Sequence, residues 1–173
     1  MASTLKVNTI QHTGGTTGLA IDSSGRVTQP TIPVFFAHGS ESGYRAAATT
    51  HTKISGWDGG GGLRIVQGGM TYSSGTVTVP VAGIYEVTGS ILTETDNGEY
   101  MLLMIYANGS TRVSLNQQYN VSAGGQIGNT AQTHAYVNLA ANNTIELHQQ
   151  AAATTARWYN NGSYGTFGVR LIG

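Results

Sequence analysis

The sequence predicts an all-β protein whose strands pack as an antiparallel sandwich. Glycine accounts for 25 of the 173 residues, and threonine, serine, asparagine and valine are abundant, a composition that favours strands and turns over helices. From Val34 onward, short apolar runs are separated by clusters of Gly, Asn and Ser, and no stretch shows a convincing helical period. Because sheets without helices bury an apolar face against another sheet, a sandwich is the expected architecture.

The first 33 residues are predicted to form a separate β segment that attaches the protein to another body. Apolar and polar residues alternate around Leu5–Val7 and Leu19–Ile21. These strands are too few to enclose a core, so we expect them to be ordered against a partner or against copies of themselves. The prolines of Gln29–Pro33 favour an extended connector. We therefore divide the chain into residues 1–33, the attachment segment, and residues 34–173, the head.

The strands of the head each show one apolar and one polar face. Within Thr144–Gln150, Ile145 and Leu147 share one face, and Glu146 and His148 share the other. One face therefore meets the core and the other meets water. Strands are predicted over Val34–Ala37, Leu63–Val66, Thr76–Val79, Ile84–Leu92, Tyr100–Ala107, Ala131–Leu139, Thr144–Gln150 and Gly165–Leu171.

One strand breaks this alternation. Both faces of Tyr100–Tyr106 are apolar or aromatic, which predicts burial on both sides. A neighbouring subunit is the simplest cover for the second face. The predicted trimer interface consists of Leu102, Leu103, Met104, Ile105 and Tyr136. Tyr136 is included as an aromatic residue on the outward face of Ala131–Leu139.

Charge and hydropathy argue against nucleic acid and membrane as partners. The formal net charge is zero and no run of Lys or Arg is present. The sequence therefore provides no cluster of positive charge to neutralise the phosphates of a nucleic acid. The longest apolar stretch, Met101–Ala107, is far shorter than the roughly 20 residues that span a bilayer. The N-terminus shows no secretory signal, which predicts synthesis in the cytoplasm. With no cysteine for disulfides, oligomerisation is the expected source of durability.

A family pattern appears in the stretch Tyr72–Tyr85. An apolar strand is followed by Pro80, Gly83 and Tyr85, which end the strand, allow a tight turn and place a large residue in the next strand. This order resembles the signature of the trimeric globular heads of the complement and tumour-necrosis-factor superfamily. Further stretches resemble the family in the same order: Val34–His38 before the signature, and Leu103–Gly109, His134–Leu147 and Tyr164–Leu171 after it.

The resemblance implies a jelly roll of about ten strands that assembles as a threefold trimer, binds partners through surface loops and performs no chemistry. The N-terminal stretches Thr4–Gln11 and Gly18–Val27 are similar to the opening of small fibre and appendage proteins of phages. The expected function is therefore that of a non-enzymatic virion protein, made in the host cytoplasm. We expect a homotrimeric fibre or fibre tip that binds the host surface, with a capsid decoration or cement protein as the alternative.

Candidates for chemistry are few. A polysaccharide-degrading enzyme would need two carboxylates about 5 to 9.5 Å apart. Glu94, Asp96 and Glu99 share one turn-like stretch, which is more typical of a solvated loop. His134 and His148, with Glu146 nearby, are expected on neighbouring strands, where three copies could gather imidazoles for a metal on the threefold axis. The sequence leaves this metal open, and we assign no catalytic residue, metal ligand or cofactor.

Aromatic residues in loops are the better candidates for binding. Trp57 precedes the glycine run Gly59–Gly62, and Arg157, Trp158 and Tyr159 precede the closing strand. Such side chains suit sugars and protein pockets, because they offer large rigid faces with polar edges. Packing in the core or at an interface is the equal alternative. We predict Trp57, Arg157, Trp158 and Tyr159 as the contacts to a host glycan or protein.

Overall fold

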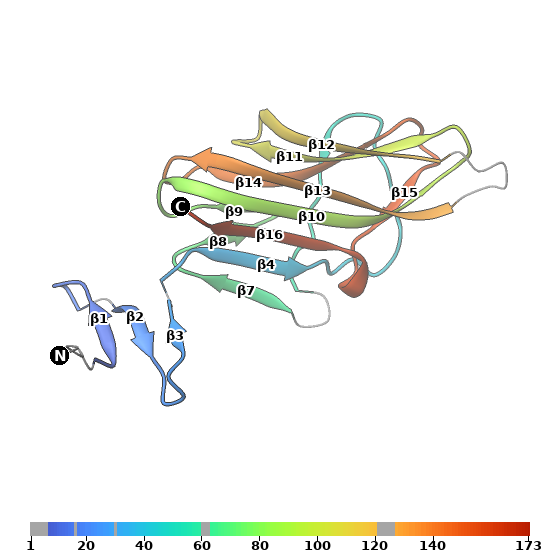
Figure 1. Cartoon of the computed structure of the whole chain (residues 1–173). Helices are drawn as coiled ribbons and strands as arrows, with labels where there is room; N and C mark the ends of the chain where they lie inside the picture. The colour runs from blue at the N-terminus through green and yellow to red at the C-terminus, as the bar shows by residue number, and fades with distance from the viewer. Residues whose placement is uncertain (1–6, 16, 30, 60–62, 121–126) are drawn as a thin grey trace, which may run out of the picture.

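The computed structural model describes residues 7–15, 17–29, 31–59, 63–120 and 127–173. Within these ranges the chain forms β-strands and one short 3-10 helix, η2 (Gly162–Tyr164), and it contains no α-helix. All strand pairs are antiparallel, and the two large sheets form a sandwich (Figure 1). The prediction of an all-β, antiparallel fold is confirmed.

The first large sheet is built around the long strand β10, and we call it the β10 sheet. Strand β10 pairs with β13 over its whole length on one side, and with β15 and β16 on the other. The sheet continues from β16 to β4 and β7, and from β15 to β5. Its strands are β4 (Val34–His38), β5 (Arg45–Ala46), β7 (Arg64–Gln67), β10 (Gly83–Thr95), β13 (Ile127–Leu139), β15 (Arg157–Tyr159) and β16 (Thr166–Leu171).

The second large sheet, the β11 sheet, faces the first across the core. Its strand order is β12-β11-β14-β9-β8, and the short strand β6 also pairs with β14. Its strands are β6 (Thr52–Lys53), β8 (Thr71–Ser73), β9 (Thr76–Thr78), β11 (Tyr100–Ala107), β12 (Thr111–Tyr119) and β14 (Thr144–Ala151).

The core lies between the sheets and follows the alternation of side chains along each strand. In β10, Tyr85, Val87, Gly89 and Ile91 are buried, while the alternate residues between them are only partly covered. The sheets approach closely at Gly89, where an added Cβ would lie 2.6 Å from Leu147 Cδ1. At the present separation of the two sheets, a glycine at this position leaves room for the Leu147 side chain.

Strand β11 corrects one prediction. Leu103 and Ile105 face the main core, so they are not at a subunit interface. On the opposite face, Leu102, Met104 and Tyr106 form a small cluster that is 9%, 0% and 8% exposed within a single chain. The expectation that another subunit must cover this face is wrong, because neighbouring side chains of the same chain already bury it.

That cover comes from the strands and the loop beside β11. Met104 lies opposite Leu115 on one side and His148 on the other. The Tyr106 ring stacks on His148 with 4.2 Å between the ring centroids, and the Tyr106 hydroxyl lies 2.6 Å from Nδ1 of His51. Stacking and a hydrogen bond within the chain itself therefore cover the face for which a partner was expected.

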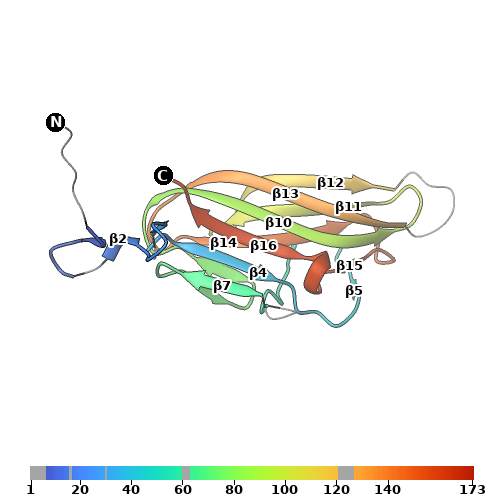
Figure 2. The same cartoon turned by 60° about the horizontal axis from the view of Figure 1, so that its bottom comes forward.

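The N-terminal strands form a third, small sheet of their own. It consists of β1 (Thr9–Gln11), β2 (Thr17–Ile21) and β3 (Val27–Thr28), and in both views it lies beyond one end of the head (Figures 1 and 2). Ile10, Ile21 and Val27 are 54%, 41% and 63% exposed. Among the described residues, no strand of this sheet pairs with a strand of the head. Its apolar side chains remain largely exposed to solvent.

Candidate functional site

Three tyrosines gather at the end of the head that is remote from the N-terminal sheet. Tyr44 precedes β5, Tyr159 ends β15, and Tyr164 ends η2. Strand β15 lies at this far end in both views (Figures 1 and 2). We call Tyr44, Tyr159 and Tyr164 the tyrosine cluster.

The rings of the cluster form a continuous strip. The centroids of Tyr44 and Tyr159 are 5.2 Å apart with 34° between the ring planes, and those of Tyr159 and Tyr164 are 5.5 Å apart with 37°. Tyr44 is 42% exposed and Tyr164 is 52% exposed, while Tyr159 between them is half-buried. The strip therefore combines mutual packing with open ring surface.

An ion pair borders the strip. Arg157 and Glu94 lie opposite each other on β15 and β10, with Nη2 3.1 Å from Oε2. The Arg157 guanidinium also lies 5.4 Å from the ring centroid of Tyr44, within range of a cation–π contact. A hydrogen bond from the Tyr44 hydroxyl to Glu94 raises the pKa of Tyr44. Donors and acceptors thus stand beside the exposed rings.

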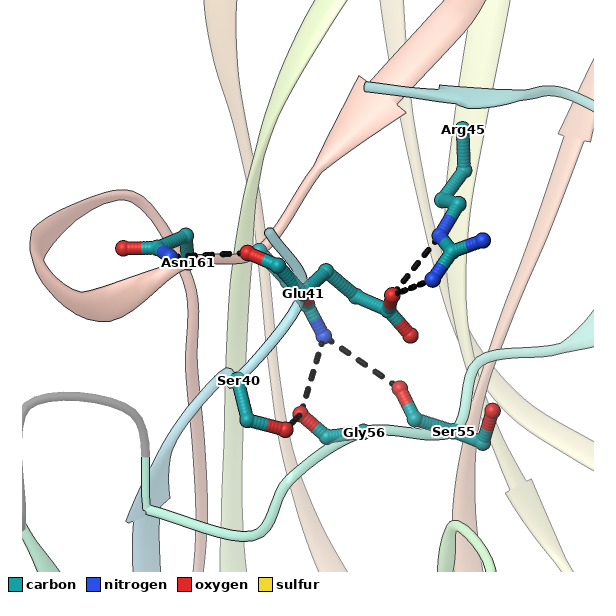
Figure 3. A network of polar contacts seen from close by, with 7 residues as sticks. Ser40, Glu41, Arg45, Ser55, Gly56 and Asn161 are labelled. Atoms are coloured by element: carbon teal, nitrogen blue, oxygen red, sulfur yellow. Dashed lines mark hydrogen bonds and ion pairs between the residues drawn. The ribbon is translucent and has the colours of Figure 1, made fainter. Parts of the chain in front are cut away.

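The loops next to the cluster are held by the network drawn in Figure 3. Arg45 forms an ion pair with Glu41, and its Nε donates to Oε2 of Glu41 at 2.7 Å. The amide of Asn161 donates to the carbonyl of Glu41 at 2.8 Å, and the Ser40 hydroxyl donates to the carbonyl of Gly56 at 3.1 Å. These bonds connect the segment just before Tyr44, the segment just after Tyr159 and the loop at Gly56.

A buried asparagine completes this support. The side-chain amide of Asn160 donates to the carbonyls of Ser55 and Gly56, both at 3.3 Å, and the residue is fully buried. The backbone of Asn160 also packs against Gly39 so closely that an added Cβ there would lie 1.5 Å from the Asn160 carbonyl oxygen. The residue that follows Tyr159 is therefore fixed in place.

Two predicted contact residues lie elsewhere. Trp57 is 0% exposed and packs 5.7 Å from Phe167 between ring centroids. Trp158 is 7% exposed and belongs to the same core. The expectation that these indoles are open to a ligand is wrong, because both rings point into the sandwich. Of the other predicted contacts, Tyr159 is the middle ring of the strip and Arg157 borders it.

Strand alternation accounts for this difference. Residues two apart in a strand share a face, so Arg157 and Tyr159 point outward when Trp158 points to the core. This signal was available in the sequence. Tyr44 could not be found in the same way, because it comes from a distant part of the chain. Tyr164 is close to Tyr159 in the sequence, but only the turn through η2 brings the two rings together.

The outer face of the β10 sheet carries the last of the predicted interface residues. Tyr136 is 64% exposed and packs against His134 edge to face, with 4.8 Å between ring centroids. Glu86 lies 3.3 Å from Nε2 of His134 and accepts a hydrogen bond from Arg170 Nε at 2.5 Å. The hydrogen bond from Arg170 holds the pKa of Glu86 below its usual value. Because most of its surface is exposed, Tyr136 remains available to a partner.

A groove lies beside this face. Its volume is about 700 Å³, and its walls come from β10, β12, β13 and the start of β16. The lining is rich in hydroxyl and amide groups, including Ser90, Asn116 and Gln132. Such a surface offers hydrogen bonds.

The structure separates the two histidines that were considered for a metal. His134 lies in the β10 sheet and His148 in the β11 sheet, so the two are not on neighbouring strands. Among the described residues, no group of three or more His, Asp or Glu side chains could hold a metal ion. Glu94 is engaged by Arg157, and Glu99 accepts a hydrogen bond from the Thr155 hydroxyl at 2.9 Å.

No protein-family model matches the chain, and no curated protein matches it. Among the residues that the structure describes, no helix has the length and hydropathy of a transmembrane segment.

Proposed function

We propose that this chain is a non-enzymatic bacteriophage virion protein that works as a homotrimer. Its N-terminal sheet attaches to other virion proteins, and its head binds the host surface as a fibre or fibre tip. The observation that carries this proposal is that the two ends of the molecule present different surfaces. Exposed apolar side chains of a coreless sheet lie at one end, and the exposed tyrosine cluster lies at the other (Figures 1 and 2).

The strand order supports a jelly roll of the complement and tumour-necrosis-factor type. Omitting the short strands β5, β6 and β15, the sheets run β7-β4-β16-β10-β13 and β8-β9-β14-β11-β12. The chain passes between them from β9 to β10, from β10 to β11, from β12 to β13 and from β13 to β14. Such crossings are typical of jelly rolls, in which consecutive strands belong to opposite sheets.

The outer face of the β10 sheet is the surface proposed for trimer contact. Tyr136 and Ile84 expose 64% and 46% of their surface there. The charge of Glu86 is compensated within the subunit by Arg170. A neighbouring subunit could therefore cover this face without burying an unpaired Glu86 carboxylate, which would be costly.

The oligomeric state tests the trimer directly. Light scattering of the purified chain should give three chain masses, and Tyr136→Glu should lower the mass, because a carboxylate would be buried at the contact. Tyr119→Glu, at a tyrosine that is 52% exposed on β12 of the β11 sheet, is a control for added charge away from this face. A stable monomer of the unaltered chain at micromolar concentration contradicts the proposal.

The exposed N-terminal sheet also supports the alternative of a capsid decoration or cement protein. Its side chains border an apolar hollow of about 170 Å³, which a neighbouring capsid subunit could fill as well as a tail protein could. Immunogold labelling of purified particles with an antibody against the head separates the two functions. Label at fibre ends supports adhesion, label spread over capsid faces supports decoration, and absence of the chain from the particles refutes both.

An enzyme acting on surface polysaccharide is the outcome that would overturn the non-enzymatic proposal. Incubation of the trimer with purified host polysaccharide, followed by chromatography of the sugar, detects it. The proposal expects no change in chain length of the polysaccharide. Appearance of shorter fragments would assign the protein to a different functional class.

A further inference from the structure

We infer that the tyrosine cluster is a carbohydrate site that takes uncharged pyranose units of a surface polysaccharide. The inference rests on the proposed adhesive function and names its ligand class. It replaces Trp57 and Trp158, which are buried, with Tyr44 and Tyr164, which are open.

The ring strip suits the apolar face of a sugar. One face of a pyranose presents C–H groups, which pack on aromatic rings, while the hydroxyls project from its rim. Tyrosine provides such a ring at low conformational cost together with a polar edge. Successive centroids along the strip are 5.2 and 5.5 Å apart, so neighbouring rings can meet neighbouring parts of an extended glycan.

The ion pair beside the strip supplies the polar contacts. Arg157 offers several N–H donors in a plane, and Glu94 offers carboxylate acceptors. Adjacent sugar hydroxyls can donate to one and accept from the other. Their side chains are 46% and 20% exposed, so both are accessible from the surface.

The same ion pair selects against acidic sugars. Arg157 already lies 3.1 Å from the Glu94 carboxylate. A carboxylated or sulfated sugar would have to displace Glu94 from Arg157 or bind close to its like charge, and either step costs free energy. An uncharged sugar can hydrogen-bond without breaking the pair.

The site is arranged before a ligand arrives. Asn161 holds the loop of Glu41, and Asn160 ties the end of β15 to the carbonyls of Ser55 and Gly56. Because these loops are fixed, binding orders little additional backbone, which preserves affinity.

The cluster is separate from the surface proposed for trimer contact. Both lie on the outer face of the β10 sheet, but Arg157 pairs with Glu94, whereas the Tyr136 group pairs with Glu86. Glu86 and Glu94 are eight positions apart along β10, which corresponds to roughly 26 Å. A subunit seated around Tyr136 can therefore leave the tyrosines open.

The experiment measures binding of the full-length protein to printed oligosaccharides. The probes are neutral glucan, galactan and mannan oligomers, with uronate-containing oligomers as acidic counterparts. We expect binding to at least one neutral oligomer. Tyr44→Ala and Tyr164→Ala should each weaken it by about threefold to tenfold, and Tyr164→Phe, which keeps the ring, should remain within about twofold.

Tyr119→Ala is the matched control. Tyr119 is 52% exposed, like Tyr164, and among the described residues it makes no ring contact with the cluster. Its removal should leave binding unchanged. Equal losses for Tyr119→Ala and Tyr164→Ala would overturn the site, and a preference for the acidic oligomers would overturn the ligand class.

Two further measurements separate this inference from the proposed function. If the unaltered protein binds host cells and the tyrosine variants bind them equally well, the site is refuted while adhesion stands. If the unaltered protein does not bind host cells, adhesion itself fails. A lower oligomeric mass of Tyr44→Ala or Tyr164→Ala by light scattering would assign the rings to a subunit contact and overturn the inference.

Discussion

Replacing Trp57 with alanine should destabilise the head strongly. Trp57 is the largest fully buried side chain among the described residues, and its ring packs against Phe167. Its removal loses the transfer free energy of the ring and leaves a cavity, which for Trp→Ala costs about 3–5 kcal/mol. For a chain of this length, about 2–4 °C is lost per kcal/mol, so the midpoint should fall by about 6–20 °C.

Trp57→Phe is the matched control for this change. Among the described residues, Nε1 of Trp57 has no hydrogen-bond partner, so phenylalanine removes an unsatisfied donor while it keeps most of the ring. Its cost should be under about 2 kcal/mol. Circular dichroism melting at one fixed protein concentration measures both variants, because the midpoint of an oligomer depends on concentration. A loss below about 1 kcal/mol for Trp57→Ala would refute the assignment of this residue to the core.

Other perturbations test the core, the charges and the segment boundary. Leu103→Ala should lower the unfolding free energy, measured in urea, by about 2–5 kcal/mol, because Leu103 faces the main core. The oligomeric mass should stay the same. A changed mass with unchanged stability would contradict this placement of Leu103. Burial raises the pKa of Glu146, but hydrogen bonds from His148, Thr76 and Lys53 outweigh it and hold the pKa below the ordinary 4.5. Ionised Glu146 therefore adds stability above about pH 4.5, and this stability is lost as the pH falls through the lowered pKa. Urea titrations should show that Glu146→Gln loses less unfolding free energy on acidification than the unaltered chain does. Identical acid profiles would refute this role of Glu146. Deleting Met1–Gln29 should leave a folded trimer by circular dichroism and light scattering that no longer enters particles, whereas an unfolded product would show that the boundary is wrong.

The alternation of side chains located most of the large strands. The predicted strands Ile84–Leu92 and Ala131–Leu139 lie within β10 and β13, which are both longer. No strand was predicted over Thr111–Tyr119, although β12 occupies it. Its alternation is weak, because only Val113 and Leu115 interrupt a polar stretch, and pairing with β11 supplies the order that the sequence does not show.

The sequence by itself determined the fold class, because the period of two along the strands is a local property that survives without knowledge of neighbours. The tertiary structure decided which aromatic rings are open. Trp57 beside a glycine run looks the same in sequence whether it is exposed or buried, and only packing against Phe167 distinguishes the two. The same applies to Met104, whose cover comes from its own chain, and to Tyr44 and Tyr164. Tyr44 meets Tyr159 through a contact between residues far apart in the chain, and Tyr164 meets it through the turn of η2; the period of two along strands encodes neither contact.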